Sequence, residues 1–180
     1  MRNYTLFFFY GTAMLIMAGL IFPIAIWHLS NRIEILETKI DAMETNRLSA
    51  QNYLNRADDV LNTVVILDAL NTSGNKEVAY NYALDFDAKA VGQLYFSAYQ
   101  KGPDKSILKL WKSSNTKELQ ELYSFYFDKW AERNNALVQD KGQLKTWLTL
   151  SNILYPLANA IGLVLIFISD FHVRKRELEE

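Results

Sequence analysis

Two long uncharged apolar runs, one near each end of the chain, constrain the fold more than any other feature. Residues 4–29 contain no Asp, Glu, Lys or Arg, and neither do residues 146–169. At 1.5 Å per residue, a helix over either run crosses the roughly 30 Å hydrocarbon layer of a bilayer. We therefore predict an all-α membrane protein with four parts: transmembrane helix 4–29, extramembrane helical bundle 30–146, transmembrane helix 147–169 and charged tail 170–180.

The first run has the properties of a retained anchor rather than a cleaved signal peptide. Its apolar core over residues 6–29 is about twice the length of a signal-peptide core. The residues after Pro23 are Ile24-Ala25-Ile26-Trp27, which is not a small-x-small cleavage site. We expect the run to stay in the protein as its first membrane span.

The charges beside the runs indicate the orientation. Arg2 precedes the first run, and Arg174-Lys175-Arg176 follows the second, so the positive-inside rule places both termini in the cytoplasm. Four basic residues on the other side oppose this: Arg32, Lys39, Lys141 and Lys145. A long translocated domain largely escapes the rule, and the absence of cysteine fits a bacterial envelope protein. We predict the bacterial inner membrane, with residues 30–146 in the periplasm.

The composition of the middle segment excludes some function classes. Between residues 30 and 146 the sequence holds 15 Lys and Arg against 16 Asp and Glu. No field of one sign exists there to attract a nucleic acid, so we expect no nucleic-acid partner. The chain has no cysteine, which removes disulfides, thiolate metal sites and thiol nucleophiles together.

Apolar residues continue at steps of three and four after the first run, which predicts a helix from the bilayer to about residue 70. Arg47 and Asp68 are the polar interruptions in this coiled-coil-like seam. Residues 71–75, Asn-Thr-Ser-Gly-Asn, are turn formers that end it. The seam consists of Ile33, Leu36, Ile40, Met43, Arg47, Ala50, Leu54, Ala57, Leu61, Val64 and Asp68.

The rest of the middle segment predicts three further helices. The first covers residues 76–100 and ends at Lys101-Gly102-Pro103-Asp104, where Gly102 permits a left-handed cap. A short helix follows over 105–112. Asn115 and Glu118 form a capping-box variant that opens the last helix, which nothing prevents from continuing into the second run. We predict an antiparallel bundle of three long helices and a short one, with almost no strand.

The helix over 76–100 is apolar on more than one side, although a three-helix bundle needs only one apolar face per helix. Three interpretations stay open: an enclosed core helix, a surface for a partner protein, or a small-molecule pocket. As a partner surface it would include Tyr80, Leu84, Val91, Tyr95 and Tyr99, together with Phe125 and Phe127 of the last helix.

Within the apolar runs, amides and small residues recur at helical spacing. Amides near the middle of a bilayer need partners, and small residues let another helix approach closely. Either the two spans pair with each other, or this face docks a different membrane subunit or a second copy. The predicted contact residues are Gly11, Ala18, Ala25, Asn152, Tyr155, Asn159 and Gly162.

No motif commits the chain to a reaction, a metal or a cofactor. Asp85 and Asp87 are two residues apart, which separates them by about 200° around a helix, and hard cations need several converging oxygens. We interpret them, and Asp58-Asp59, as solvated faces. Zinc-protease, nucleophile-elbow and phosphate-loop patterns are absent from the sequence. We expect a protein that is not an enzyme and that binds no cofactor.

Two functions follow from this description. The first is a non-catalytic membrane-anchored interaction or scaffold subunit of a larger membrane assembly. The second is a sensor or signal-relay protein, because the predicted bundle resembles, in architecture alone, the periplasmic four-helix sensor domains of bacterial chemoreceptors and histidine kinases. The 11 residues after Ser169 leave no room for an output domain, which favours the first. A pore is disfavoured, since neither run carries a repeated polar stripe.

Overall fold

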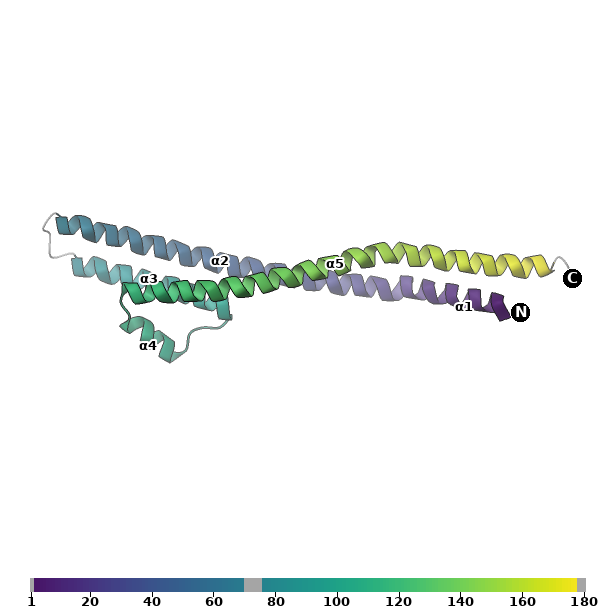
Figure 1. Cartoon of the computed structure of the whole chain (residues 1–180), viewed down its shortest axis with the longest axis horizontal. Helices are drawn as coiled ribbons and strands as arrows, with labels where there is room; N and C mark the ends of the chain where they lie inside the picture. Colours follow the sequence, from purple (N-terminus) through teal and green to yellow (C-terminus); the bar gives the residue numbers. More distant parts are fainter. Residues whose placement is uncertain (1, 70–75, 178–180) are drawn as a thin grey trace. The chain divides into compact units, whose positions relative to one another are not determined.

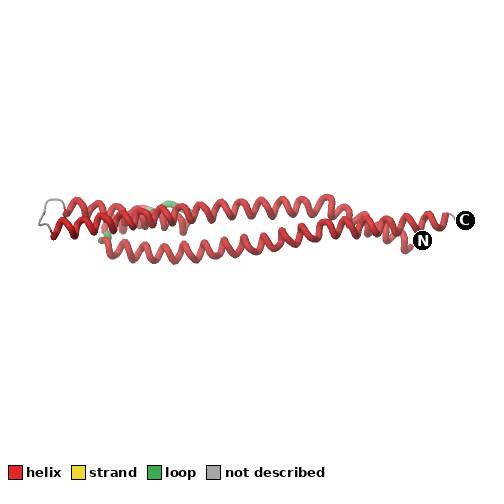
Figure 2. The backbone as a smooth tube through the Cα atoms, turned by 90° about the horizontal axis from the view of Figure 1, so that it is seen from above, coloured by secondary structure: helices red, strands yellow, loops and turns green. Residues whose placement is uncertain are grey.

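The computed structural model describes residues 2–69 and 76–177, and these residues are almost entirely helical (Figures 1 and 2). No strand occurs in this part of the chain, which confirms the predicted all-α class. The turn predicted over 71–75 lies outside the described residues. The elements are α1 Arg2–Ile16, the π-helical turn η1 Met17–Ile21, α2 Phe22–Ala69, α3 Lys76–Tyr99, α4 Lys105–Ser113 and α5 Thr116–Glu177.

The helix starts follow from side chains that cap free backbone N–H groups. At the start of α4, one carboxylate oxygen of Asp104 accepts from the N–H groups of Ser106 and Ile107, both at 2.9 Å. At the start of α5, Asn115 and Glu118 each accept the other's backbone N–H through the side chain, at 3.0 Å. The predicted capping box is therefore confirmed.

The end of α3 differs from the prediction. The left-handed residue is Gln100, with φ of 55°, and its N–H donates to the carbonyl of Phe96 at 2.7 Å. Gly102 lacks a positive φ and does not cap the helix. Helix α3 ends at Tyr99, and Gly102 directly precedes Pro103, where proline restricts the backbone to extended conformations.

The π-helical turn between α1 and α2 has a local cause in Pro23. Proline has no N–H, and its ring clashes with the carbonyl four residues earlier, which here is that of Gly19. The turn widens, and the N–H of Phe22 donates to the carbonyl of Met17, five residues back. The first apolar run thus remains helical through its proline.

The chain divides into two compact units. Residues 37–139 form the central unit, and the described residues before 37 and after 139 form the apolar unit. Both α2 and α5 contribute a segment to each unit.

One backbone carbonyl connects the three long helices of the central unit. The carbonyl of Met43 on α2 accepts a hydrogen bond from Ser97 Oγ of α3 at 2.8 Å and from Trp130 Nε1 of α5 at 3.3 Å. Arg133 of α5 also donates to the carbonyl of Ala98, at 2.8 Å. All three donors reach carbonyls on another helix, so the polar contacts align the helices as well as hold them.

Small residues allow α2 and α3 to pack closely. Met43 meets Ser97, and Tyr53 stacks on Phe86 with ring centroids 6.4 Å apart, so the two helices run antiparallel. One and two heptads from the Met43–Ser97 contact, this register opposes Ala50 to Ala90 and Ala57 to Ala83. All four alanines are 0% exposed.

Helix α4 lies beside α3 and α5 (Figure 1) and packs against them through Trp111. The Trp111 ring is 5% exposed and meets Tyr95 of α3 at 5.8 Å and Tyr126 of α5 at 6.4 Å between centroids, both edge-on. Tyr95 and Tyr126 themselves are in edge contact at 5.1 Å. These rings close the side of the core opposite the alanine contacts.

We expect Trp130→Ala to lower the free energy of unfolding by about 3 kcal/mol or more, because the ring is 8% exposed and leaves a cavity. Unfolding of the full-length protein in detergent, followed by far-ultraviolet circular dichroism, measures this. The matched control is Phe125→Ala on the same helix, whose ring is 51% exposed and whose loss should cost about 1 kcal/mol or less. Equal losses in the two variants would contradict this account of the core.

Candidate interaction surfaces

Two helical segments, Tyr4–Ile66 and Thr116–Arg176, are long and apolar enough to cross a membrane. In each, only 11% of the most apolar 18-residue window is buried within the protein. The core helix of a soluble protein of similar composition is mostly buried. The apolar unit therefore leaves most of its hydrocarbon surface without a protein cover.

Helices α1 and α5 approach each other closely at Gly11 and Gly162. A Cβ added to Gly162 would lie 3.0 Å from the carbonyl oxygen of Gly11, and one added to Gly11 would lie 2.9 Å from that of Gly162 and 2.8 Å from Ile166. Backbone against backbone leaves no space for side chains. Both positions thus require glycine for this contact.

The other residues of the predicted membrane face lie in different environments. Ala18 is fully buried, and Ala25 is half-buried. Asn152 and Tyr155 are exposed, and Asn159 is half-buried. Among the described residues, neither amide has a hydrogen-bond partner. The structure thus brings Gly11 and Gly162 together but gives the two asparagines no partner among the described residues, so their role as contact residues stays a prediction.

Polar contacts close the other end of this helix pair. Ser169 Oγ donates to the carbonyl of Tyr4 at 3.1 Å, and the Tyr4 ring lies 4.6 Å from that of His172. Asp170 pairs with Arg174 at 3.0 Å. Ser169 is only 5% exposed, so its hydroxyl depends on this partner on α1 for a hydrogen bond.

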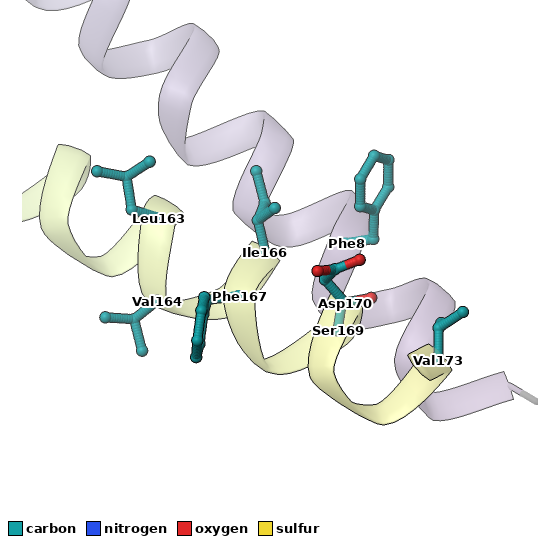
Figure 3. A pocket seen from close by; sticks show the side chains of 8 residues that line it. All are labelled: Phe8, Leu163, Val164, Ile166, Phe167, Ser169, Asp170 and Val173. Carbon is teal, nitrogen blue, oxygen red and sulfur yellow. The ribbon is translucent and has the colours of Figure 1, made fainter. Parts of the chain in front are cut away.

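An open groove of about 720 Å³ runs beside these contacts, with Phe8 on α1 and the remaining lining side chains on α5 (Figure 3). Ser169 and Asp170 supply its polar groups, and both already have partners. The groove is therefore suited to hydrocarbon rather than to a polar small molecule. Its lining consists of Phe8, Leu163, Val164, Ile166, Phe167, Ser169, Asp170 and Val173.

In the central unit, two residues of the predicted partner surface belong to the core. Val91 is 1% exposed and Tyr95 is 6% exposed. The prediction was wrong for these two because α3 packs against α2 on one side and against α4 and α5 on another, so it needs two apolar faces. Leu84 is half-buried and packs against the same core.

The remaining predicted partner residues are exposed but do not form one patch. Tyr80 and Tyr99 are 19 residues apart on α3, about 28 Å along the helix axis. Phe125 and Phe127 lie about 200° apart around α5, on either side of the buried Tyr126. A single partner could not cover all four side chains with a small interface.

A further set of exposed apolar side chains lies near the end of α2 and in the first two turns of α3. The ion pair between Asp68 and Lys76 holds these two helix ends together. Sequence reasoning missed this surface, although Val64-Val65-Ile66 has more apolar residues than one seam can bury. We name it the apolar tip, and it consists of Val65 (67% exposed), Ile66 (59%), Val78 (54%), Tyr80 (40%) and Tyr82 (60%).

Arg47, the polar interruption in the α2 seam, is half-buried and finds its partners within the central unit. Its guanidinium donates to both carboxylate oxygens of Glu44, at 2.9 and 2.6 Å, and lies 5.4 Å from the centre of the Trp130 ring. The hydrogen bond from Arg47 lowers the pKa of Glu44. The charge is satisfied there by a carboxylate and an aromatic face.

Asp87 is the most unusual polar residue of the central unit. It is 1% exposed, and neither carboxylate oxygen has a hydrogen-bond partner among the described residues. Burial, and secondly the charge of Asp58, raise the pKa of Asp87 from 3.8 to about 6. The sequence-based assignment of Asp87 to a solvated face was wrong. The missed signal is its spacing, because Asp87 lies one heptad before the buried Leu94.

The other predicted acidic positions behave as solvated groups. Asp85 is exposed and pairs with Lys89 at 2.6 Å, and Asp58 and Asp59 are exposed. Within residues 2–69 and 76–177, no three His, Cys, Asp or Glu side chains converge on a possible metal position. A search of known protein families, curated proteins and solved structures finds no match to this chain.

We expect Asp87→Asn to raise the free energy of unfolding at pH 8 by up to about 3 kcal/mol, since folding raises the pKa of the carboxyl by about two units. The folded state binds the proton more tightly than the unfolded state. The free energy of unfolding is therefore unaffected by Asp87 ionisation below pH 3.8, and it falls as the pH rises through about 6. The advantage of the variant should disappear below about pH 4.

Asp85→Asn is the matched control for this measurement, because Asp85 lies on the same helix and is exposed. Its effect should stay under about 1 kcal/mol, as for surface ion pairs. Denaturation of both variants and the parent in detergent, from pH 4 to pH 8, supplies the comparison. A parallel offset at every pH for Asp87→Asn would show that its ionisation is not linked to folding.

Proposed function

We propose that this protein is a non-catalytic, membrane-anchored interaction subunit of a larger membrane assembly. Its two apolar segments lie in the bilayer as spans, and the central unit forms a helical bundle outside it that binds a partner protein. The proposal places the chain in a bacterial inner membrane, with both termini in the cytoplasm and residues 30–146 in the periplasm.

The exposed hydrocarbon of the apolar unit supports membrane insertion. Large apolar side chains on α1, α2 and α5 are more than half exposed, including Phe9 (66%), Ile24 (65%) and Phe167 (71%). In water this surface would favour aggregation, whereas in lipid it has no cost. Arg174, Lys175 and Arg176 at the end of α5 support a cytoplasmic C-terminus.

The apolar tip is the observation that carries the interaction function. Five large apolar side chains from two helix ends are exposed, next to an ion pair that holds those ends together. In the core of the central unit, by contrast, the rings of Tyr95, Trp111, Tyr126 and Trp130 are buried. Val78 and Tyr82 lie four residues apart on one face of α3, and exposed apolar surface of this kind on a polar domain supports a contact with another protein.

We expect the protein to resist extraction from membranes by alkaline carbonate, as spanning helices do. The chain has no cysteine, so single cysteines report topology directly. A membrane-impermeant maleimide should label Ser124→Cys in spheroplasts and should label Lys175→Cys only after the membrane is permeabilised. Release by carbonate, or labelling of Lys175→Cys from outside, would contradict the proposed insertion or the proposed orientation, respectively.

We expect Ile66→Glu combined with Tyr82→Glu to abolish retention of a stoichiometric partner, because charges at the apolar tip would have to be desolvated in the interface. Extraction of the tagged protein in mild detergent, followed by native mass measurement, tests this. The matched control is Leu48→Glu with Val138→Glu, which are 50% and 45% exposed elsewhere in the central unit. Melting temperatures of both double variants should stay close to that of the parent.

The buried Asp87 favours a second function, in which the central unit relays a signal through protonation. In that case the captured partner should differ between pH 5 and pH 8 in the parent and not in Asp87→Asn. A partner retained equally at both pH values leaves Asp87 a structural feature. Retention of the partner by the Ile66→Glu and Tyr82→Glu double variant would contradict the apolar tip as the interaction surface.

A further inference from the structure

Two asparagine side chains occupy one flank of α5 inside its apolar segment. Asn152 and Asn159 are seven residues apart, so they lie almost above each other on the helix surface. Asn152 is exposed and Asn159 is half-buried. The contact face toward α1 is the neighbouring stripe, which contains the buried Ala158 and Gly162.

Pro156 adds a third polar group to this flank. Proline has no N–H, so the carbonyl of Asn152 cannot receive the regular hydrogen bond from four residues later. In the bilayer that the proposed function assigns to this segment, no water or lipid group satisfies these atoms. Asn159 lies about 18 Å along the helix from Trp147, close to the middle of the run 147–169.

Helix α1 does not supply the missing partners. It contacts α5 through Gly11, which has no side chain. The hydroxyl of Thr12 is already bonded to the carbonyl of Phe8 on its own helix, at 2.9 Å. Among the described residues, both amides therefore remain without a partner.

We infer that the Asn152/Asn159 flank of α5 binds the same flank of a second copy of this chain, forming a parallel two-fold dimer of spans. Copies inserted into one membrane share an orientation, so their α5 helices run parallel. A two-fold axis along the membrane normal then places each asparagine against its own counterpart.

The chemistry of the amide favours this occupant. An asparagine side chain carries both donors and an acceptor, so two copies satisfy each other without a different residue type. A spacing of seven keeps both positions on the seam of two helices that wind around each other. The Asn152 carbonyl, which Pro156 deprives of its regular hydrogen bond, offers one further acceptor beside the two Asn152 side chains.

The absence of cysteine provides the experiment. Leu163→Cys lies on the same flank, four residues after Asn159, and keeps both amides. Ile161→Cys is the control at nearly the same depth, about 200° around the helix from Asn159 and 47% exposed. Under mild oxidation of native membranes, Leu163→Cys should form a disulfide-linked homodimer about tenfold faster than Ile161→Cys.

Replacing both asparagines with leucine in the Leu163→Cys protein should then reduce dimer formation about tenfold, the scale of one or two hydrogen bonds between membrane helices. Glutamine at position 159, which keeps the amide, should restore most of it. Equal rates at positions 163 and 161, no effect of the leucine variant, or a cross-link to a protein of different mass would each overturn the dimer.

This inference rests on the proposed membrane insertion, and the two fail in different ways. Release of the chain by carbonate contradicts insertion itself. A chain that resists carbonate but gives no dimer contradicts the second copy as the occupant and leaves the membrane-anchored subunit standing.

Discussion

The central unit depends on one shared acceptor, the carbonyl of Met43. A helical carbonyl already bonded along its own axis keeps a second lone pair, and here Ser97 and Trp130 direct donors at it from two other helices. Such bonds contribute about 1 kcal/mol each, so their main effect is on alignment. Once Ser97 opposes Met43, the heptad-spaced alanines of α2 and α3 fall opposite one another and the helices can close.

The same alignment explains why Asp87 is buried. Position 87 lies between Ala83 and Ala90 on the closed face of α3, so any register that seats the alanines also covers the carboxylate. A leucine there would continue the core that Leu94 begins. The chain instead keeps a carboxyl group whose burial raises its pKa to about 6, so the packing of α2 on α3 is linked to proton binding in that pH range.

Periodicity and capping chemistry predict the helices from the sequence, because both are local. The limits of α3 and α4, the capping box at Asn115, and the continuous α5 all follow from residues within a few positions of each other. Burial is not local. Two apolar stripes on α3 look alike in sequence, and only the placement of α2, α4 and α5 decides that Val91 is core while Tyr80 is surface. Asp87 was misassigned for the same reason, since packing against other helices decides the burial of a residue.

Arg47 of the central unit finds its partners among the described residues, whereas Asn152 and Asn159 of the apolar unit do not. The difference lies in which side chains lie beside each of them. Arg47 has a carboxylate one turn away and an aromatic ring across the interface, so its charge is satisfied inside one chain. Asn152 and Asn159 lie beside a contact to which the neighbouring helix contributes Gly11. Close approach of backbones and satisfaction of amides are competing demands, because small residues carry no donors. A helix pair that meets the first demand through Gly11 and Gly162 leaves the second unmet among the described residues, which is why we propose a second copy as the partner of the amides.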